Sequence, residues 1–179
     1  MTAQDILHFW FDEATPAQHF RKDTAFDAAI RKRFAEVQRA ATQGELSAWR
    51  DSADGRLAEI IVLDQFSRNL FRDDARAFSS DGMALVLAQE AVRAGADREL
   101  PPARRAFLYM PFMHSESKMV HLDAERLFRQ PGLEDNYKFE LKHKAIIERF
   151  GRYPHRNKVL GRMSTPEEIA FLEQPGSSF

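Results

Sequence analysis

The sequence contains no cysteine, and this absence excludes several kinds of site. Without thiolates the chain cannot form a disulfide, a cysteine-ligated zinc site, an iron–sulfur cluster or a cysteine nucleophile. A secreted chain of 179 residues could also lack disulfides, but a reducing compartment is the simpler interpretation. We therefore expect a cytoplasmic protein.

Long apolar runs are also missing. The longest near-continuous run extends from Ala106 to Met113, far short of the roughly 20 residues needed to cross a bilayer. The stretch from Met1 to Ile6 has neither a basic region nor an apolar segment, so we expect no secretory signal. The sequence thus predicts no membrane association.

What the sequence does contain is enough apolar material for a folded domain. Hydrophobic residues make up 44% of the chain and include 15 phenylalanines, which argues against disorder. The length suits one domain, and no low-complexity linker divides it. We therefore expect residues 1–179 to form a single domain.

Signals for helix starts recur along the chain, whereas strand signals do not. Thr2 and Asp23 are placed to cap helices, and apolar residues recur at three- and four-residue steps from Phe26 to Ala41. Residues 165–168 read Thr-Pro-Glu-Glu, a capping box with proline at the first helical position. The pattern predicts an all-α fold of about nine helices, which could stack as a bundle or a short solenoid of helix pairs.

Three further helix boundaries can be predicted from single residues. Asp54 is expected to cap the helix that carries Leu57. Pro111 should end or kink the helix that starts near Ala103, because proline lacks an amide proton and its ring crowds the preceding turn. Ser115 then becomes the expected cap of the following helix.

The charge is unevenly distributed, although the net charge is only −1. Residues 142–162 contain seven Lys/Arg and one Glu, a local balance of +6, while the other residues contain 19 Lys/Arg and 26 Asp/Glu. A basic segment on an acidic body indicates an internal counter-charge or an anionic partner.

Three polar segments carry the candidate site residues, and the first contains Arg68, Asn69 and Arg72 at the end of an apolar helix. An arginine offers five donors in a rigid fork that suits a carboxylate or a phosphate. The structural alternative is that Arg68 and Asn69 pair with helix-end carbonyls and with Asp64 or Asp73.

The second segment follows Pro111 and contains His114, Ser115 and Glu116. His114 could act as an acid, a base or a hydrogen-bond donor near neutral pH. His114 and Glu116 do not share a helical face, and His114 with His121 is a weak metal signal, so we predict no metal site. The structural alternative makes Ser115 a helix cap and His114 a hydrogen-bonded core residue.

The third segment, residues 149–162, is a basic loop shaped by two glycines and a proline. A rigid, positively charged loop is suited to binding an anion. It contains neither a Walker loop nor a dinucleotide fingerprint, so we expect no nucleotide and no other cofactor. The structural alternative is a loop held to acidic helix ends by its arginines. The candidate residues of this segment are Arg152, His155, Arg156, Asn157 and Arg162.

Together with residues 6–11, these segments resemble a mainly bacterial helical family catalogued as domain of unknown function 924. The similarity spans nearly the whole chain, and the run Phe-Gly-Arg-Tyr-Pro-His-Arg-Asn at 150–157 is its most specific part. The matching stretches are Phe26-Asp27, Leu63 to Arg72, Phe107 to Glu116, His143 to Asn157, and Gly161-Arg162 with Thr165.

This resemblance implies a fold and adds a residue, but it implies no activity. The implied fold is a tetratricopeptide-like, right-handed superhelical array of antiparallel helix pairs, and the added site residue is His143. The chain departs from the family pattern at Ser67, where the family often has proline. It departs again at Ser117 and His121, where the family tends to have an acidic residue and a later glutamine.

Four functional hypotheses remain open from the sequence. The first is a groove that binds a small anionic molecule or an acidic peptide, and the second is a metal-independent hydrolase or transferase acting on an anionic substrate. In the enzyme, His114 or His155 would be the acid–base and Arg156 the charge clamp. The third is a purely structural polar network with a protein-interaction role. The fourth is RNA binding with Tyr153 and Phe150 as stacking groups, against which the net charge argues.

Overall fold

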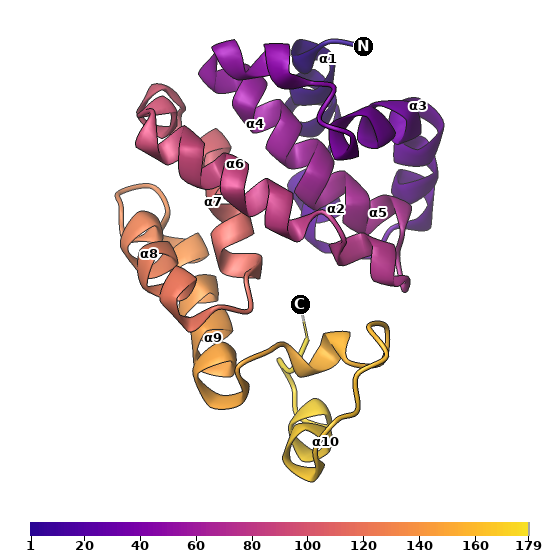
Figure 1. Cartoon of the computed structure of the whole chain (residues 1–179), viewed down its shortest axis with the longest axis vertical. Coiled ribbons are helices and arrows are strands. Elements are labelled where there is room, and N and C mark those ends of the chain that lie inside the picture. The colour runs from indigo at the N-terminus through magenta and orange to yellow at the C-terminus, as the bar shows by residue number, and fades with distance from the viewer. Residues whose placement is uncertain (179) are drawn as a thin grey trace.

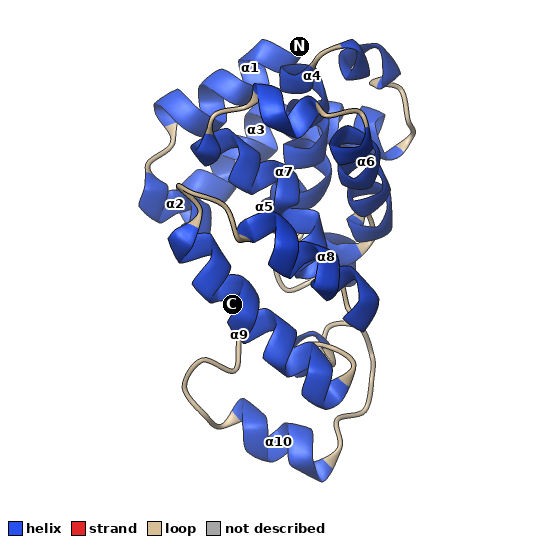
Figure 2. Ribbon diagram, turned by 90° about the vertical axis from the view of Figure 1, so that its left-hand side faces the viewer, coloured by secondary structure: helices blue, strands red, loops and turns tan. Residues whose placement is uncertain are grey.

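The computed structural model describes residues 1–178, and all regular structure in them is helical, with no strand (Figure 2). The predicted all-α class is therefore confirmed. The α-helices are α1 (Ala3–His8), α2 (Pro16–Phe20), α3 (Thr24–Thr42), α4 (Ala53–Ile61), α5 (Ser67–Leu70), α6 (Asp81–Arg93), α7 (Pro102–His114), α8 (Lys118–Phe128), α9 (Glu134–Phe150) and α10 (Pro166–Leu172). Short π or 3₁₀ turns extend or connect them at η1 (Phe9–Glu13), η2 (Ser47–Asp51), η3 (Val62–Phe66), η4 (Ala75–Phe78), η5 (Ala96–Glu99) and η6 (Pro154–Arg156).

Several helices begin where their capping residues predicted. Thr2 caps α1 in a capping box with Asp5, and the Asp23 carboxylate accepts the first free amides of α3. Thr165 and Glu168 form the predicted capping box of α10. These bonds satisfy amide groups that a helix start leaves without a partner.

Two predicted caps are wrong, and of the two outcomes expected at Pro111 the helix end is wrong. Ser52, not Asp54, caps α4, because its hydroxyl accepts the Gly55 amide at 3.1 Å. Ser117, not Ser115, is the N-cap of α8. Helix α7 does not end at Pro111 but continues to His114, because residues 111–113 are buried and apolar and their packing holds the last turn in place.

Gly55 shows why the start of α4 needs a glycine. A Cβ atom built on Gly55 would lie 1.9 Å from the carbonyl oxygen of Trp49 in η2. Only a residue without a side chain lets the first turn of α4 lie this close to the preceding turn.

Helix α4 continues through the π turn η3 into α5 without a break, so that the described residues hold nine separate α-helical stretches. All five residues of η3 are buried, including Asp64 at 0% exposure. A π turn inserts one extra residue into the helical path and so changes the direction in which the following side chains point. The sequence pattern did not reveal this turn.

The main apolar core lies between α1, α3, α4, α6, α7 and α8 (Figure 1). Helix α4 is central, since it packs against α1, α6 and α7. Aromatic rings fill the space beside it, and Trp10, Phe34 and Phe66 are each almost fully buried. This packing fixes the ends of α5, α6 and α7, from which the candidate site is built.

The C-terminal part lies apart from this core. Helix α9 packs on α8 and α7. Figure 1 shows α10 beyond the C-terminal end of α9. A second, small apolar cluster contains Ile146, Ile147 and Tyr153, with Phe150 and Phe171 packed against it. Because this apolar cluster is small, polar contacts contribute much of the attachment of the C-terminal part to the rest of the protein. Across residues 1–178, no helix combines the length and apolarity that membrane crossing requires.

Candidate functional site

Asn69 and Arg72 both hydrogen-bond to Asp27, in the N-terminal half of the chain. Arg72 donates to both oxygens of the Asp27 carboxylate, at 2.6 and 2.7 Å, and Asn69 donates to the same carboxylate at 2.8 Å. Burial acts to raise the pKa of Asp27, but these donors hold it below its ordinary value. Asn69 and Arg72 therefore hold α5 against α3.

Asp64 is a fully buried carboxylate beside Arg68 and His114, and its oxygens receive three side-chain donors. Arg68 donates to Oδ1 at 3.0 Å, Gln65 donates to Oδ2 at 2.6 Å, and His114 Nδ1 lies 2.8 Å from Oδ1. Burial alone would raise the pKa of Asp64, but the charge of Arg68 and the contact with His114 hold it well below its ordinary value. Asp64 is therefore an anion that accepts every one of these hydrogen bonds.

The contact with Asp64 determines the tautomer of His114. An ionised carboxylate has no proton to give, so the hydrogen in the bond to Asp64 belongs to His114 Nδ1. Burial lowers the pKa of His114, and the Asp64 charge offsets only part of that effect. The ring is therefore neutral at pH 7, with its lone pair on Nε2. Nε2 makes no hydrogen bond within residues 1–178, and 17% of the side chain is exposed.

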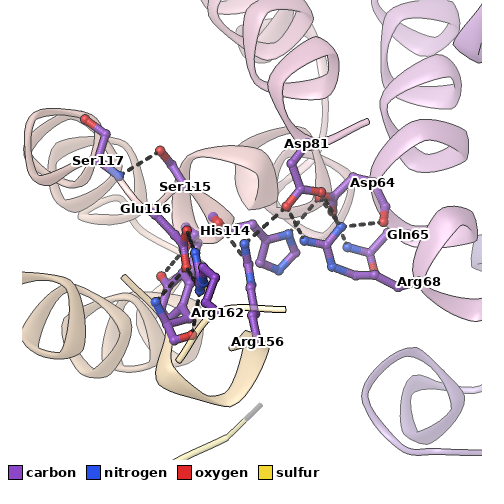
Figure 3. A network of polar contacts seen from close by, with 12 residues as sticks. Asp64, Gln65, Arg68, Asp81, His114, Ser115, Glu116, Ser117, Arg156 and Arg162 are labelled. Atoms are coloured by element: carbon purple, nitrogen blue, oxygen red, sulfur yellow. Dashed lines mark hydrogen bonds and ion pairs between the residues drawn. The ribbon is translucent and has the colours of Figure 1, made fainter. Parts of the chain in front are cut away.

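Asp81, the first residue of α6, joins two arginines from distant parts of the chain. Arg68 donates to both of its oxygens, at 2.8 and 2.9 Å. Arg156, in the turn η6, lies 3.4 Å from Oδ2 and donates to the main-chain oxygen of His114 at 2.9 Å. Figure 3 shows Arg156 and Arg68 on either side of His114. The ends of α5, α6 and α7 and the turn η6 thus meet at one polar cluster.

The positive charge of Arg156 has the most distant carboxylate among the candidate arginines. The other four each have a carboxylate oxygen at 2.6–2.8 Å, whereas the Asp81 oxygen lies 3.4 Å from Arg156. Arg156 is 7% exposed, and its buried Nε has no acceptor in the described part of the chain. Burial and the nearby Arg68 lower the pKa of Arg156. The rings of Phe78 and Tyr153, each centred 4.6 Å away, supply part of the missing stabilisation.

Glu116 anchors the basic loop to the end of α7. Arg162 donates to both of its oxygens, and the Tyr153 amide donates to Oε1 at 2.7 Å. Burial acts to raise the pKa of Glu116, but these donors lower it below its ordinary value. Arg162 also donates to Asn157 at 2.9 Å, which places Asn157 inside the loop. Glu116 is thus an internal counter-charge of the basic segment.

Glu168 closes the same loop onto α10. Arg152 donates to both of its oxygens, at 2.7 and 2.8 Å, and Asn157 donates to Oε2 at 3.3 Å. The bonds from Arg152, assisted by the Thr165 amide, lower the pKa of Glu168 to about 2. Arg152, Asn157 and Arg162 therefore form a structural clamp with Glu116 and Glu168.

A second histidine–carboxylate pair lies beneath this loop. His121 and Glu140 are both 0% exposed and lie 2.7 Å apart. His121 Nε2 donates to the Ser115 carbonyl at 2.8 Å, and the Tyr153 hydroxyl, which donates to the Met113 carbonyl at 2.6 Å, lies 3.2 Å from the same nitrogen. Burial raises the pKa of Glu140, and its Oε2 has no partner among the described residues.

His143 and His155 are held neutral by burial. Burial lowers the pKa of His143 to about 3, although its Nδ1 donates to the Phe139 carbonyl at 2.8 Å. Burial and the charge of Arg156 lower the pKa of His155 to about 4. Both rings pack against Tyr153. Each histidine is therefore uncharged at pH 7.

Two surface clefts lie away from this cluster. One, of about 370 Å³, opens along α8, and the other, of about 300 Å³, opens between α3 and the start of α6. Their linings are Leu122, Glu125, Arg126 and Arg129 in the first, and Gln38, Thr42, Phe71, Arg76, Ser79, Ser80 and Met83 in the second. None of the candidate residues lines either cleft.

Comparison with known proteins agrees with this architecture. The family model described as "Bacterial protein of unknown function (DUF924)" matches residues 6–176. The chain belongs to the DUF924 family. It is similar to the solved structure of a protein of unknown function, ATU0120, from Agrobacterium tumefaciens, with 40% identity, a TM-score of 0.88 and 96% coverage of each chain. No curated protein matches.

Three residues of this DUF924 chain depart from the pattern expected of the family, and each makes contacts within the fold. Ser67 is fully buried and accepts a hydrogen bond from Gln38 at 3.1 Å. Ser117 caps α8, and His121 makes the buried pair with Glu140.

The structure places the candidate residues of this DUF924 chain in separate surroundings, with His143 and His155 against Tyr153. His114 and Arg156 meet Arg68 at the Asp81 cluster, while Asn69 and Arg72 bind elsewhere, on Asp27. The loop clamp takes Glu116, Arg152, Asn157 and Arg162, and Ser115 accepts the amide of Ser117 at 3.2 Å. Asp81 was not among the predicted site residues, because nothing in its neighbouring sequence marks it as a partner of two arginines.

Proposed function

We propose that this DUF924 protein binds a small anion at the Asp81 cluster, where Arg156 and Arg68 lie beside His114. The supporting observation is the state of Arg156. Four candidate arginines are neutralised at close range by carboxylates of the same chain, and Arg156 is not. A buried guanidinium without a close counter-ion is costly, and an anion would supply the missing charge and hydrogen-bond acceptor.

Exposure favours a small molecule over a peptide tail or RNA. The side chains of His114 and Asp81 keep 17% and 19% of their surface exposed, which leaves little area for an extended partner. Tyr153 is 0% exposed and cannot stack on a base, which removes a main support of the RNA hypothesis.

The absence of cysteine is consistent with a cytoplasmic setting, which we also propose.

The anion site can be tested with acetate as the probe. We expect acetate to raise the melting temperature of the wild type above that in chloride at the same ionic strength, because acetate binds the native state. Arg156→Met should lose this difference. Arg72→Met is the matched control, since it removes an arginine that Asp27 already neutralises, and it should keep the response.

Two results would count against the anion site. One is an equal acetate response in wild type and Arg156→Met. The other is a wild-type NMR spectrum in which the His114 ring signals do not move as acetate is added, a measurement that needs no variant.

A second candidate function is acid–base catalysis, and the Asp64–His114 pair favours it. A carboxylate that holds Nδ1–H leaves Nε2 as a base of fixed direction, as in the histidines of hydrolases. Arg156 would then hold the anionic part of a substrate. The discriminating experiment is a hydrolase and transferase screen of anionic substrates with wild type and His114→Gln. Binding without turnover would limit the site to the first function.

We also propose that α6 to α9 form consecutive antiparallel pairs of a tetratricopeptide-like array. Each helix of this series packs on the next, as α6 on α7, α7 on α8 and α8 on α9. Such stacking is the property on which solenoid arrays depend. The proposal requires one common rotation to relate the successive pairs, and unequal rotations would contradict it.

A further inference from the structure

We infer that the ligand of the Asp81 cluster is a small anion that carries a hydroxyl or amino donor beside its negatively charged group. This inference rests on the anion site proposed above and names the class of molecule that suits it. It depends on what each group around His114 can donate or accept.

Asp64 settles the donor and acceptor roles of His114. Its carboxylate is fully buried, and Arg68, Gln65 and His114 all direct hydrogens toward it. The His114 proton is therefore on Nδ1, and Nε2 can only accept a hydrogen bond while the ring is neutral. Reversal of the tautomer would place a lone pair against an ionised carboxylate.

The groups around His114 require two different features of one ligand, since Arg156 donates to its main-chain oxygen and Arg68 shares the Asp64 carboxylate with its Nδ1. Arg156 and Arg68 carry only donors, and Arg156 retains a buried Nε without an acceptor among residues 1–178. A carboxylate suits these arginines, but its oxygens would oppose the lone pair of His114 Nε2. A hydroxyl or an amine next to the carboxylate removes that conflict, because it donates to Nε2.

Asp81 strengthens this requirement. Its carboxylate is 19% exposed at the same cluster and, like Nε2, can only accept while ionised. A plain anion would therefore meet two acceptors as well as two arginines. Asp81 and His114 lie in the same cluster (Figure 3), so a donor on the ligand lowers the repulsion between the ligand and these two acceptors.

Three small carboxylates test the inference on the wild type. Glycolate has the hydroxyl donor, acetate lacks the hydroxyl, and methoxyacetate has an ether oxygen that cannot donate. We expect glycolate to bind roughly three- to tenfold more tightly than acetate or methoxyacetate in calorimetric titration, the usual effect of one neutral hydrogen bond. Methoxyacetate controls for size and for the added oxygen.

His114→Phe should remove the glycolate preference and leave acetate binding in place. His8→Phe is the matched control, since His8 is an exposed histidine that also lies 2.9 Å from an aspartate, Asp12. His8→Phe should keep the full preference. If His114→Phe does not fold, the wild-type comparison of the three carboxylates still decides the question.

The outcomes separate the two proposals. If none of the three carboxylates binds, the anion site itself is wrong. If all three bind equally, the site stands and the donor requirement is overturned. A preference for glycolate that survives in His114→Phe would also overturn it, because the donor would then be recognised by another group.

Discussion

Arg162 donates two hydrogen bonds to the Glu116 carboxylate, at 2.7 and 2.9 Å, across 46 positions of the sequence. This bidentate pair joins the loop before α10 to the end of α7. The apolar cluster beneath the loop is small, so the pair carries much of the attachment of the C-terminal segment. The same loop holds Arg156 in position beside His114.

Arg162→Ala should lower the free energy of unfolding by about 2–3 kcal/mol, the usual effect of removing charge-assisted hydrogen bonds from a partly buried carboxylate. Arg149→Ala removes a more exposed pair with Glu167 and should cost at most about 1 kcal/mol. Denaturant titration of both variants measures the difference. Equal losses would mean that the Glu116 pair does not anchor the loop.

Glu140→Ala should be strongly destabilising, by about 3–5 kcal/mol, because it leaves Nδ1 of the buried His121 without its charged partner. The double variant His121→Leu/Glu140→Leu should lose less than Glu140→Ala, because it removes both polar groups together. The comparison requires chemical denaturation of the two variants and wild type. A double variant less stable than Glu140→Ala would show that the pair stabilises the core by itself.

Glu168 should make the stability of the protein fall in acid. Its pKa is lowered to about 2 in the folded protein from an ordinary 4.5, so its contribution is complete above about pH 4.5 and is lost as the pH falls toward 2. Glu168→Gln should therefore be less stable than wild type at pH 6. The difference should narrow as the pH falls from 4.5 to 2. Unfolding curves across this range check the sign, which a constant difference would contradict.

Gly55→Ala should destabilise the start of α4 by about 1–3 kcal/mol, the range for forcing extra atoms into a packed site. The added methyl group would lie 1.9 Å from the Trp49 carbonyl oxygen, so the backbone of η2 or α4 must shift. Gly82→Ala, in the first turn of α6 with nothing within 4 Å, is the control. Thermal unfolding should show a clear loss for Gly55→Ala and little change for Gly82→Ala.

Local chemistry explains what could be predicted about the helices. Thr2, Asp23 and Thr165 cap helices by bonds to amides two or three residues ahead, and such bonds depend on neighbouring residues alone. The errors at Asp54 and Ser115 arose where several capping residues stand close together. Which one caps the helix then depends on how the preceding turn packs.

Less of the candidate site than of the helices could be predicted from the sequence. Residue type and spacing identified Arg68, His114 and Arg156, since such side chains in apolar surroundings need partners. The sequence could not show which arginine would lack a close counter-charge. Asp81 lies 75 positions from Arg156, and their separation of 3.4 Å follows from the packing of α6 against α7 and the position of η6.

The sequence by itself determined the all-α class and most helix starts, because periodicity and capping act within a few positions. Only the tertiary structure decided which charges meet, which histidine nitrogen carries the proton, and which side chains are buried. Hydrogen bonds and ion pairs need contact within about 3 Å, and for residues far apart in the chain that contact exists only after the helices have packed.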